Sequence, residues 1–146
     1  MFYGEYEHTI DRKGRLIIPA KFREIVRENL IEKFFITRGL DGCLFVFIEE
    51  EWRQQERSFR SIPFTKSEGR KFNRLYFSGA REVTCDKQGR ILIPKYLKDF
   101  ADIKNDVVIV GVSNRFEIWS KARWVEFYKT SKESYEEIAE GLMGGE

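Results

Sequence analysis

The sequence predicts a mixed, mainly β fold with flanking helices (α+β), in which two tandem halves form one pseudo-twofold β-barrel. Two observations support this prediction. The segment DRKGRLIIP at residues 11–19 returns as DKQGRILIP at residues 86–94, seventy-five positions later. Each copy then shows the same order of expected elements: strand, turn, strand, helix, strand, strand, helix. A repeat of this length indicates that a whole structural unit is duplicated.

The first copy opens with aromatic and polar residues near period two at residues 2–10, which predicts a strand with one wet face. Asp11 and Gly14 suit the first and fourth positions of a hairpin turn, where Asp accepts backbone N–H bonds and Gly adopts a left-handed conformation. Pro19 ends the next strand, at 15–18, because it has no N–H to donate. The other elements expected in this copy are a helix at 20–32, strands at 34–38 and 43–48, and a helix beginning at 49.

A connector follows the first copy. Residues 58–63 are expected to form a loop and residues 65–78 a helix, in which Thr65 and Glu68 have capping-box spacing. One face of this helix is basic and is either a solvated surface or a phosphate-contacting one. Its basic residues are Lys66, Arg70, Lys71 and Arg74.

The second copy repeats the first. Strands are expected at 82–85, 90–93, 106–112 and 116–119, and a short helix at 95–101. Ser120 is the expected N-cap of a final helix. The apolar side of that helix would hold Trp124, Phe127, Tyr128, Tyr135, Ile138 and Leu142.

The repeat defines the expected domain organisation. The four parts are a first repeat at 5–52, a helical connector at 53–80, a second repeat at 81–124, and a C-terminal helix and tail at 125–146. One copy of roughly fifty residues would bury too little apolar surface to be comfortably stable alone. Two copies can pair each other's strand edges and close a barrel. This arrangement would place the two basic turns on one side of the molecule.

Charge is dense but nearly balanced, with 34% charged residues and a formal net charge of +2. Its distribution is uneven. Residues 53–81 hold eight basic and two acidic residues, whereas residues 126–146 hold six acidic and two basic residues. Local basic regions beside an acidic tail are consistent with an anionic partner on one face. Because no secretion signal or membrane-length apolar run is present, we expect a cytoplasmic protein.

Little in the sequence suggests an enzyme or a cofactor. The two cysteines, Cys43 and Cys85, lie in apolar contexts without metal-ligand spacing, and His8 alternates with apolar residues in an expected strand. Asp11 and Asp86 could in principle form an aspartic-protease-like dyad. However, a basic residue follows each of them directly, which would keep both carboxylates ionised. We therefore expect no enzymatic activity, no cofactor, no metal and no small-molecule substrate.

Turn chemistry accounts for Asp and Gly in both copies, and the barrel core for the aliphatic run, but neither accounts for Arg15 and Arg90. A guanidinium can bind guanine N7 and O6 or a phosphate through two hydrogen bonds, and a hairpin tip fits the major groove. In each copy the Asp four positions earlier is placed to orient the Arg by a charged hydrogen bond. From these residues alone, two hypotheses stay open: a nucleic-acid-binding surface, and a basic solvated turn in a protein-interaction module.

The doubled pattern D-x-x-G-R-[LI]-x-I-P resembles the SpoVT/AbrB family of swapped-hairpin β-barrel DNA-binding domains. Two copies in one chain resemble the bacterial transcriptional regulators of this family that are associated with the division and cell-wall gene cluster. The resemblance covers about residues 2–130. It implies that the halves form an intramolecular counterpart of the AbrB dimer and that chains assemble into a closed ring. It also implies binding to short G-rich direct repeats in double-stranded promoter DNA, usually with repression, and association with the nucleoid.

The resemblance also implies which residues contact DNA. Arg15 and Arg90 would be central, and the loop-orienting residues would be Asp11, Gly14, Asp86 and Gly89. The two loops differ in their flanking residues, so equal contributions are not expected. The flanking DNA contacts would be Arg12, Lys13, Lys87 and Gln88. The alternative function is a ring-forming interaction scaffold without specific DNA binding.

Overall fold

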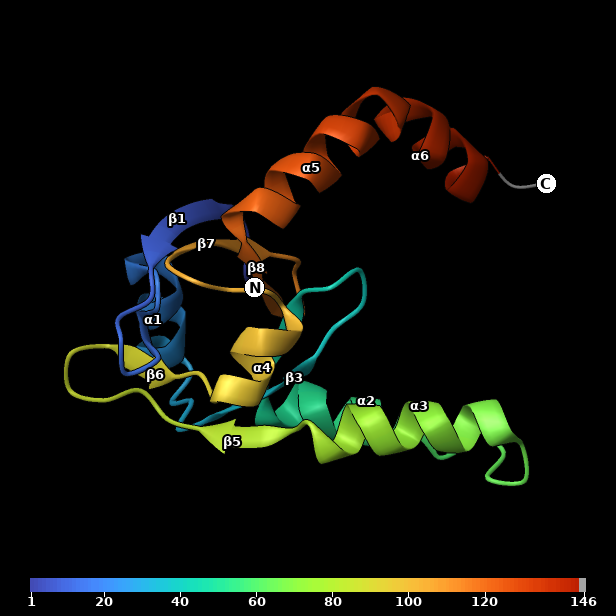
Figure 1. Ribbon diagram of the computed structural model, residues 1–146, viewed down its shortest axis with the longest axis horizontal. Helices are drawn as coiled ribbons and strands as arrows, with labels where there is room; N and C mark the ends of the chain where they lie inside the picture. The colour runs from blue at the N-terminus through green and yellow to red at the C-terminus, as the bar shows by residue number, and fades with distance from the viewer. Residues whose placement is uncertain (145–146) are drawn as a thin grey trace.

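The computed structural model describes residues 1–144, and it confirms a mixed α+β fold with antiparallel strands and helices (Figure 1). The strands form a six-stranded sheet in the order β1-β7-β8-β4-β3-β5 and a two-stranded ribbon of β2 and β6. The strands are β1 (Glu5–Thr9), β2 (Arg15–Ile17), β3 (Phe34–Arg38), β4 (Leu44–Ile48), β5 (Arg81–Val83), β6 (Arg90–Leu92), β7 (Asp106–Gly111) and β8 (Phe116–Ser120).

Helices follow the strands in the order that the repeat predicts. Those of the first half and the connector are α1 (Ala20–Glu28), α2 (Glu49–Phe59) and α3 (Ser67–Ser78). Those of the second half are α4 (Lys95–Phe100), α5 (Lys121–Ser131), a 3₁₀ turn η1 (Lys132–Ser134) and α6 (Tyr135–Met143). In the described part of the chain, no helix has the length and apolar character that a membrane crossing requires.

The strand pairing is symmetric between the two halves. β1 of the first half pairs with β7 of the second, and β5 of the second half pairs with β3 of the first. β2 pairs with β6, and β4 pairs with β8, so each of these strands pairs with the equivalent strand of the other half. Exchanging the halves therefore leaves the pairing map unchanged, and each half supplies edges that the other covers.

The turn at residues 11–14 forms as predicted, but the hairpin predicted between the first two strands does not. Only an isolated bridge between Ile10 and Leu16 joins them, after which β1 pairs with β7 and β2 with β6. Each of the two strands instead pairs along its length with a strand of the other half. Within residues 1–144, no pairing joins β1 to β5, so closure into a barrel stays a prediction.

Several element ends also differ from the prediction. The first helix stops at Glu28, and Leu30 has a positive φ of 54° and is 86% exposed. Lys66 is the N-cap of α3 and no side chain caps it, so the predicted capping box of Thr65 and Glu68 does not form. Ser120 does cap α5, because its hydroxyl accepts the N–H of Arg123 at 3.2 Å.

The inner strands β3, β4 and β8 of the six-stranded sheet are buried on both faces. Alternate residues of β4 divide between two clusters: Leu44 and Val46 join the larger core, and Phe45 and Phe47 join an aromatic one. The larger core lies between the sheet, the β2–β6 ribbon and helices α1 and α4. The aromatic cluster lies on the opposite face and includes Trp52 of α2. Burial of both faces explains the nearly continuous apolar runs of these strands.

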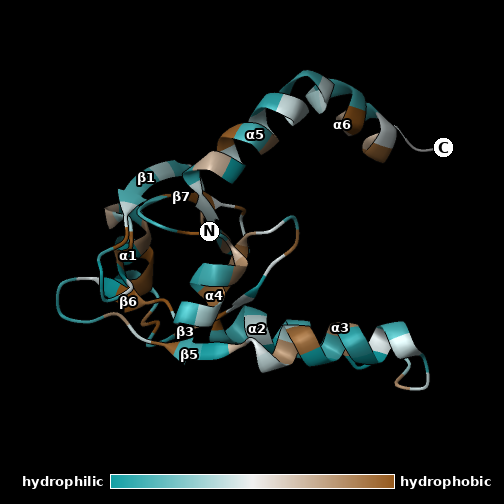
Figure 2. Cartoon of the chain, in the orientation of Figure 1, coloured by the Kyte–Doolittle hydropathy of each residue, from teal (hydrophilic) through white to brown (hydrophobic). Residues whose placement is uncertain are grey.

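Two helical parts extend from this body. Helices α2 and α3 lie side by side and project in one direction, and α5 and α6 project in another (Figure 1). The predicted single C-terminal helix is broken at η1 into α5 and α6, and none of the three has a buried residue. Figure 2 shows hydrophobic residues along these exposed helices.

Candidate nucleic-acid interface

The two repeated turns have the same hydrogen-bond geometry. In the first, Oδ1 of Asp11 accepts the backbone N–H groups of Lys13 at 3.0 Å and of Arg15 at 2.8 Å. Oδ2 of Asp11 accepts Nε–H of Arg15 at 2.7 Å. Gly14 closes the turn with a φ of 85°, a conformation that favours glycine.

In the second turn, Oδ1 of Asp86 accepts the N–H groups of Gln88 and Arg90, both at 2.9 Å. Oδ2 of Asp86 accepts Nε–H of Arg90 at 2.8 Å, and Gly89 has a φ of 79°. The predicted orientation of each arginine by the aspartate four positions earlier is therefore present in both turns.

These hydrogen bonds lower the pKa of both aspartates. For Asp11 and Asp86 alike, the largest cause is the N–H of the arginine four residues later, and the guanidinium of that arginine adds to it. Partial desolvation opposes the effect but is outweighed. A dyad that shares a proton needs one raised carboxyl pKa. Two separately bound, ionised carboxylates are unsuited to that chemistry.

The β2–β6 ribbon joins the two turns. Its register pairs Arg15 with Leu92 and Ile17 with Arg90. Just beyond the ribbon, two further hydrogen bonds link each half to the turn of the other. The N–H of Ile18 donates to the carbonyl of Gly89 at 2.9 Å, and the N–H of Ile93 donates to the carbonyl of Gly14 at 2.7 Å. The turns thus lie at opposite ends of one short ribbon. The backbone positions of Arg15 and Arg90 are only two residues apart along the ribbon, a distance of roughly 7 Å in that direction.

One face of the ribbon is buried and the other is open. Leu16 and Ile91 point into the larger core, with 0% and 1% exposure. The alternate positions hold the two arginines and the aliphatic residues Ile17 and Leu92, which are 42% and 53% exposed. Assigning the whole aliphatic run to the core was therefore wrong for these two positions, because strand side chains alternate between faces.

Each arginine has an unoccupied binding edge. Arg15 and Arg90 use Nε to bind their aspartates, and within residues 1–144 their terminal nitrogens donate no hydrogen bond. Their side chains remain 34% and 24% exposed. A guanidinium fixed at Nε can still present its two Nη groups to a planar pair of acceptors.

The four predicted flanking residues surround this face and are all exposed. The first turn holds three basic residues and one acidic residue, and the second holds two basic residues and one acidic residue. Both turns are therefore cationic, and the first is the more so. The flanking residues are Arg12, Lys13, Lys87 and Gln88.

Arg23 of α1 is a residue that sequence reasoning missed. Its Nε donates to the carbonyl of Ile18 at 3.0 Å, and its side chain lies against Gly89 of the other half. With Arg27 and Lys87 it lines a hollow beside the second turn. The sequence indicates only that Arg23 is a basic residue of the helix after Pro19. Its position beside Gly89 follows from the tertiary structure.

The basic face of α3 is distant from the ribbon. Lys66, Arg70, Lys71 and Arg74 are exposed on the projecting α2–α3 hairpin, on the opposite side of the molecule from β6 (Figure 1). Arg70 also donates to the carbonyl of Phe64 at 2.9 Å. This position separates the α3 face from the two turns.

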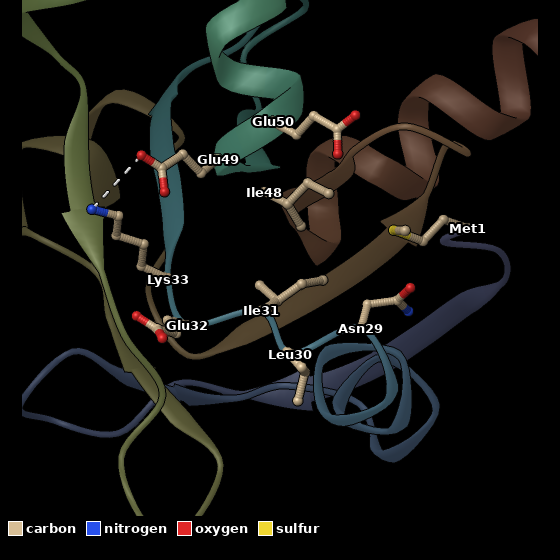
Figure 3. A pocket seen from close by; sticks show the side chains of 9 residues that line it. All are labelled: Met1, Asn29, Leu30, Ile31, Glu32, Lys33, Ile48, Glu49 and Glu50. Atoms are coloured by element: carbon tan, nitrogen blue, oxygen red, sulfur yellow. Dashed lines mark ion pairs between the residues drawn. The ribbon is translucent and has the colours of Figure 1, made fainter.

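A pocket between the end of α1 and the start of α2 also lies apart from the turns. Figure 3 shows Lys33 facing Glu49 across a 3.9 Å ion pair, with Glu32 and Glu50 on the same lining. Three glutamates and one lysine do not favour a phosphate. No group of three or more residues suited to holding a metal ion occurs in residues 1–144.

A family model described as "MraZ protein, putative antitoxin-like" matches the chain twice, over residues 1–75 and 76–144. The matches begin seventy-five positions apart, which is the spacing of the two turns. Together they cover nearly the whole chain and confirm the two-copy resemblance. The family is one of regulators rather than enzymes. The chain therefore belongs to the MraZ family.

Proposed function

We propose that the protein is a sequence-specific DNA-binding transcriptional regulator whose β2–β6 ribbon reads the major groove. The observation that carries this proposal is the pair of arginines on the open face of the ribbon. Arg15 and Arg90 are each fixed at Nε by an aspartate and have unoccupied Nη groups. A two-stranded ribbon fits the major groove, and a bidentate arginine selects guanine there.

Fixing the guanidinium favours recognition over simple charge attraction. A free arginine loses rotamer freedom on binding, about 1 kcal/mol or more for a long side chain. Here the aspartate already restricts that freedom, so less is lost when a base is contacted. The exposed Arg12, Lys13 and Lys87 would supply the phosphate contacts that position the ribbon.

The SpoVT/AbrB resemblance extends the proposal to the target. The protein would bind G-rich direct repeats in the promoter of the division and cell-wall gene cluster, including its own gene, and usually repress transcription. It would then be associated with the nucleoid. Two arginines about 7 Å apart along the ribbon would reach guanines about two base pairs apart, given a rise of about 3.4 Å per base pair.

Self-association into a closed ring is part of the proposal and rests on an asymmetry between the halves. Trp52 of α2 is 3% exposed because Tyr76 and Phe77 of α3 cover it. Trp124 occupies the matching position of α5, and within residues 1–144 no helix covers α5 in that way. A neighbouring copy would supply the cover, and repeated head-to-tail contacts close rings.

Charge also favours contact between copies. The α3 face is basic, whereas α6 exposes Glu136, Glu137 and Glu140 beside the apolar Ile138 and Leu142. A ring would bring several ribbons to tandem repeats and raise the affinity through effective concentration. The same exposed helices favour the alternative function, a ring-forming protein-interaction scaffold without specific DNA binding.

Selection from a random duplex library tests the proposed function, because it requires no assumption about the operator sequence. The purified protein should enrich a G-containing motif, and its affinity for that duplex should fall steeply with salt. Arg15→Ala and Arg90→Ala should each lose about 1–3 kcal/mol of binding free energy per base contact. Arg57→Ala, an exposed arginine of α2, is the matched control.

The competing outcomes of this experiment are distinct. If no motif is enriched, or if both ribbon variants bind as tightly as Arg57→Ala, DNA recognition by the ribbon is contradicted. A scaffold without DNA specificity would show neither a sequence preference nor a steep salt dependence.

A further inference from the structure

The open face of the β2–β6 ribbon carries two aliphatic side chains that the fold does not bury. Ile17 and Leu92 are 42% and 53% exposed, although their strand neighbours Leu16 and Ile91 are almost completely buried. Single exposed apolar residues are ordinary. Here, however, both halves expose one at the same place, directly opposite an arginine: Leu92 opposite Arg15, and Ile17 opposite Arg90.

These side chains are integral to the recognition face. A methyl group of Leu92 lies 3.6 Å from the position that a Cβ on Gly14 would occupy, so Leu92 lies against the first turn. Cross-strand partners on one face are about 5 Å apart at Cβ. Each aliphatic residue is therefore an immediate neighbour of an arginine with unoccupied Nη groups.

We propose that Ile17 and Leu92 contact the C5-methyl groups of thymines in the major groove, and so determine sequence specificity next to the guanines that the arginines read. This proposal rests on the proposed function. The thymine methyl is the only apolar group that the unmodified base edges present in the major groove. An aliphatic side chain facing any other base edge would cover a polar group without satisfying it.

The arrangement of the four residues sets the expected spacing. A separation of about 5 Å across the ribbon spans at most one or two base pairs at a rise of about 3.4 Å, whichever way the ribbon lies in the groove. Each guanine that an arginine contacts should therefore have a thymine within about two base pairs, on either DNA strand.

Charge favours DNA over a second copy of this chain as the occupant of the face. Arg15 and Arg90 lie on the face, and the exposed Lys13 and Lys87 lie beside it. Two such faces would repel each other, whereas the major groove of a duplex offers acceptor atoms and flanking phosphates.

Substitution of deoxyuridine for thymidine tests the proposal, because it removes only the C5-methyl group. The probe is the duplex enriched by the intact protein from the random library, with each thymidine replaced in turn. At one or more positions the affinity of the unmodified protein should fall about fourfold, the effect of losing one buried methyl-sized group. Ile17→Ser or Leu92→Ser should abolish the response at its own position. Leu40→Ser, at a 60% exposed leucine between β3 and β4, should keep the full response.

The other outcomes separate this inference from the proposed function. If the enriched duplex binds but no deoxyuridine changes its affinity, or the enriched motif lacks thymine, the methyl contact is wrong and DNA binding stands. If deoxyuridine changes the affinity of the unmodified protein and of both serine variants equally, the methyl contact is likewise wrong and DNA binding stands. If no duplex is enriched at all, the proposed function fails and the methyl contact fails with it.

Discussion

The N–H of Ile93 donates to the carbonyl oxygen of Gly14 at 2.7 Å, so the residue that follows β6 in the second half fixes the turn of the first. The equivalent bond in the other direction runs from Ile18 to Gly89 at 2.9 Å. Each of the two repeated turns therefore depends on the other half for its position. The duplicated segment functions as one two-stranded unit, which explains why both copies must be in the same folded body.

Substitution of Gly14 should destabilise the protein through this contact. In Gly14→Ala, a Cβ would lie 2.8 Å from the carbonyl oxygen of Ile93, at a residue whose φ is 85°. We expect the free energy of unfolding to fall by about 1–3 kcal/mol, measured by urea denaturation. Gly141→Ala is the control, because nothing lies within 4 Å of a Cβ there and alanine favours a helix. Equal stability of the two variants would contradict the strained contact.

Neutralising the orienting aspartate should change specific and non-specific DNA binding in opposite directions. Asp11→Asn removes a negative charge beside three basic residues, so binding to random duplex should strengthen slightly. It also weakens the charged hydrogen bond to Arg15, so binding to the selected duplex should weaken by about 1–2 kcal/mol. The measurement is a pair of titrations on the two duplexes at one salt concentration. A parallel increase on both would mean that Asp11 acts only through its charge.

The lowered pKa of Asp11 and of Asp86 predicts a loss of stability in acid. Each folded-state pKa lies below the ordinary value of 3.8, chiefly because of the N–H of Arg15 or Arg90. The contribution is therefore fully present well above pH 3.8. It is lost as the pH falls through the folded pKa, because the unfolded chain binds the proton first. Urea midpoints measured from pH about 5 to about 2 should fall less steeply for Asp11→Asn/Asp86→Asn than for the unmodified protein. Identical pH profiles would show that the turns contribute nothing to acid sensitivity.

The two matching tryptophans should differ in their effect on the monomer. Trp52 stacks on Phe35 at 5.5 Å and on Tyr76 at 5.6 Å, so Trp52→Ala should cost about 3–5 kcal/mol of stability. Trp124 is only half-buried, and Trp124→Ala should cost about 1 kcal/mol in the dilute chain. Denaturation at low protein concentration measures both. Equal costs would indicate that α5 is as well covered as α2.

The exposed side of α5 and α6 should matter for assembly rather than for folding. Leu142 is 80% exposed and neither helix has a buried residue, so Leu142→Glu should leave the urea midpoint of the dilute chain unchanged. If a neighbouring copy covers this surface, the mass measured by light scattering should fall in the variant. Lys129→Glu, at an exposed polar position of α5, is the control for the added charge. An unchanged mass would place the subunit contact elsewhere.

The sequence by itself determined the duplication, the turn chemistry and most element positions. Asp11 and Asp86 act locally, within five residues, so spacing was enough to predict their bonds to Arg15 and Arg90. Short-range patterns likewise located β3 and the N-cap at Ser120. They did not reveal where α1 ends, because the residue with a positive φ after this helix is Leu30 and not the glycine that usually marks such an end.

Only the tertiary structure decided which strands pair and which aliphatic residues stay exposed. Pairing of β1 with β7 joins residues about a hundred positions apart, and alternation within one strand cannot select a distant partner. Ile17 and Ile18 are chemically identical and adjacent, yet one is 42% exposed and the other is fully buried. The difference arises because the core covers one face of the ribbon and leaves the other, with both arginines, open to solvent.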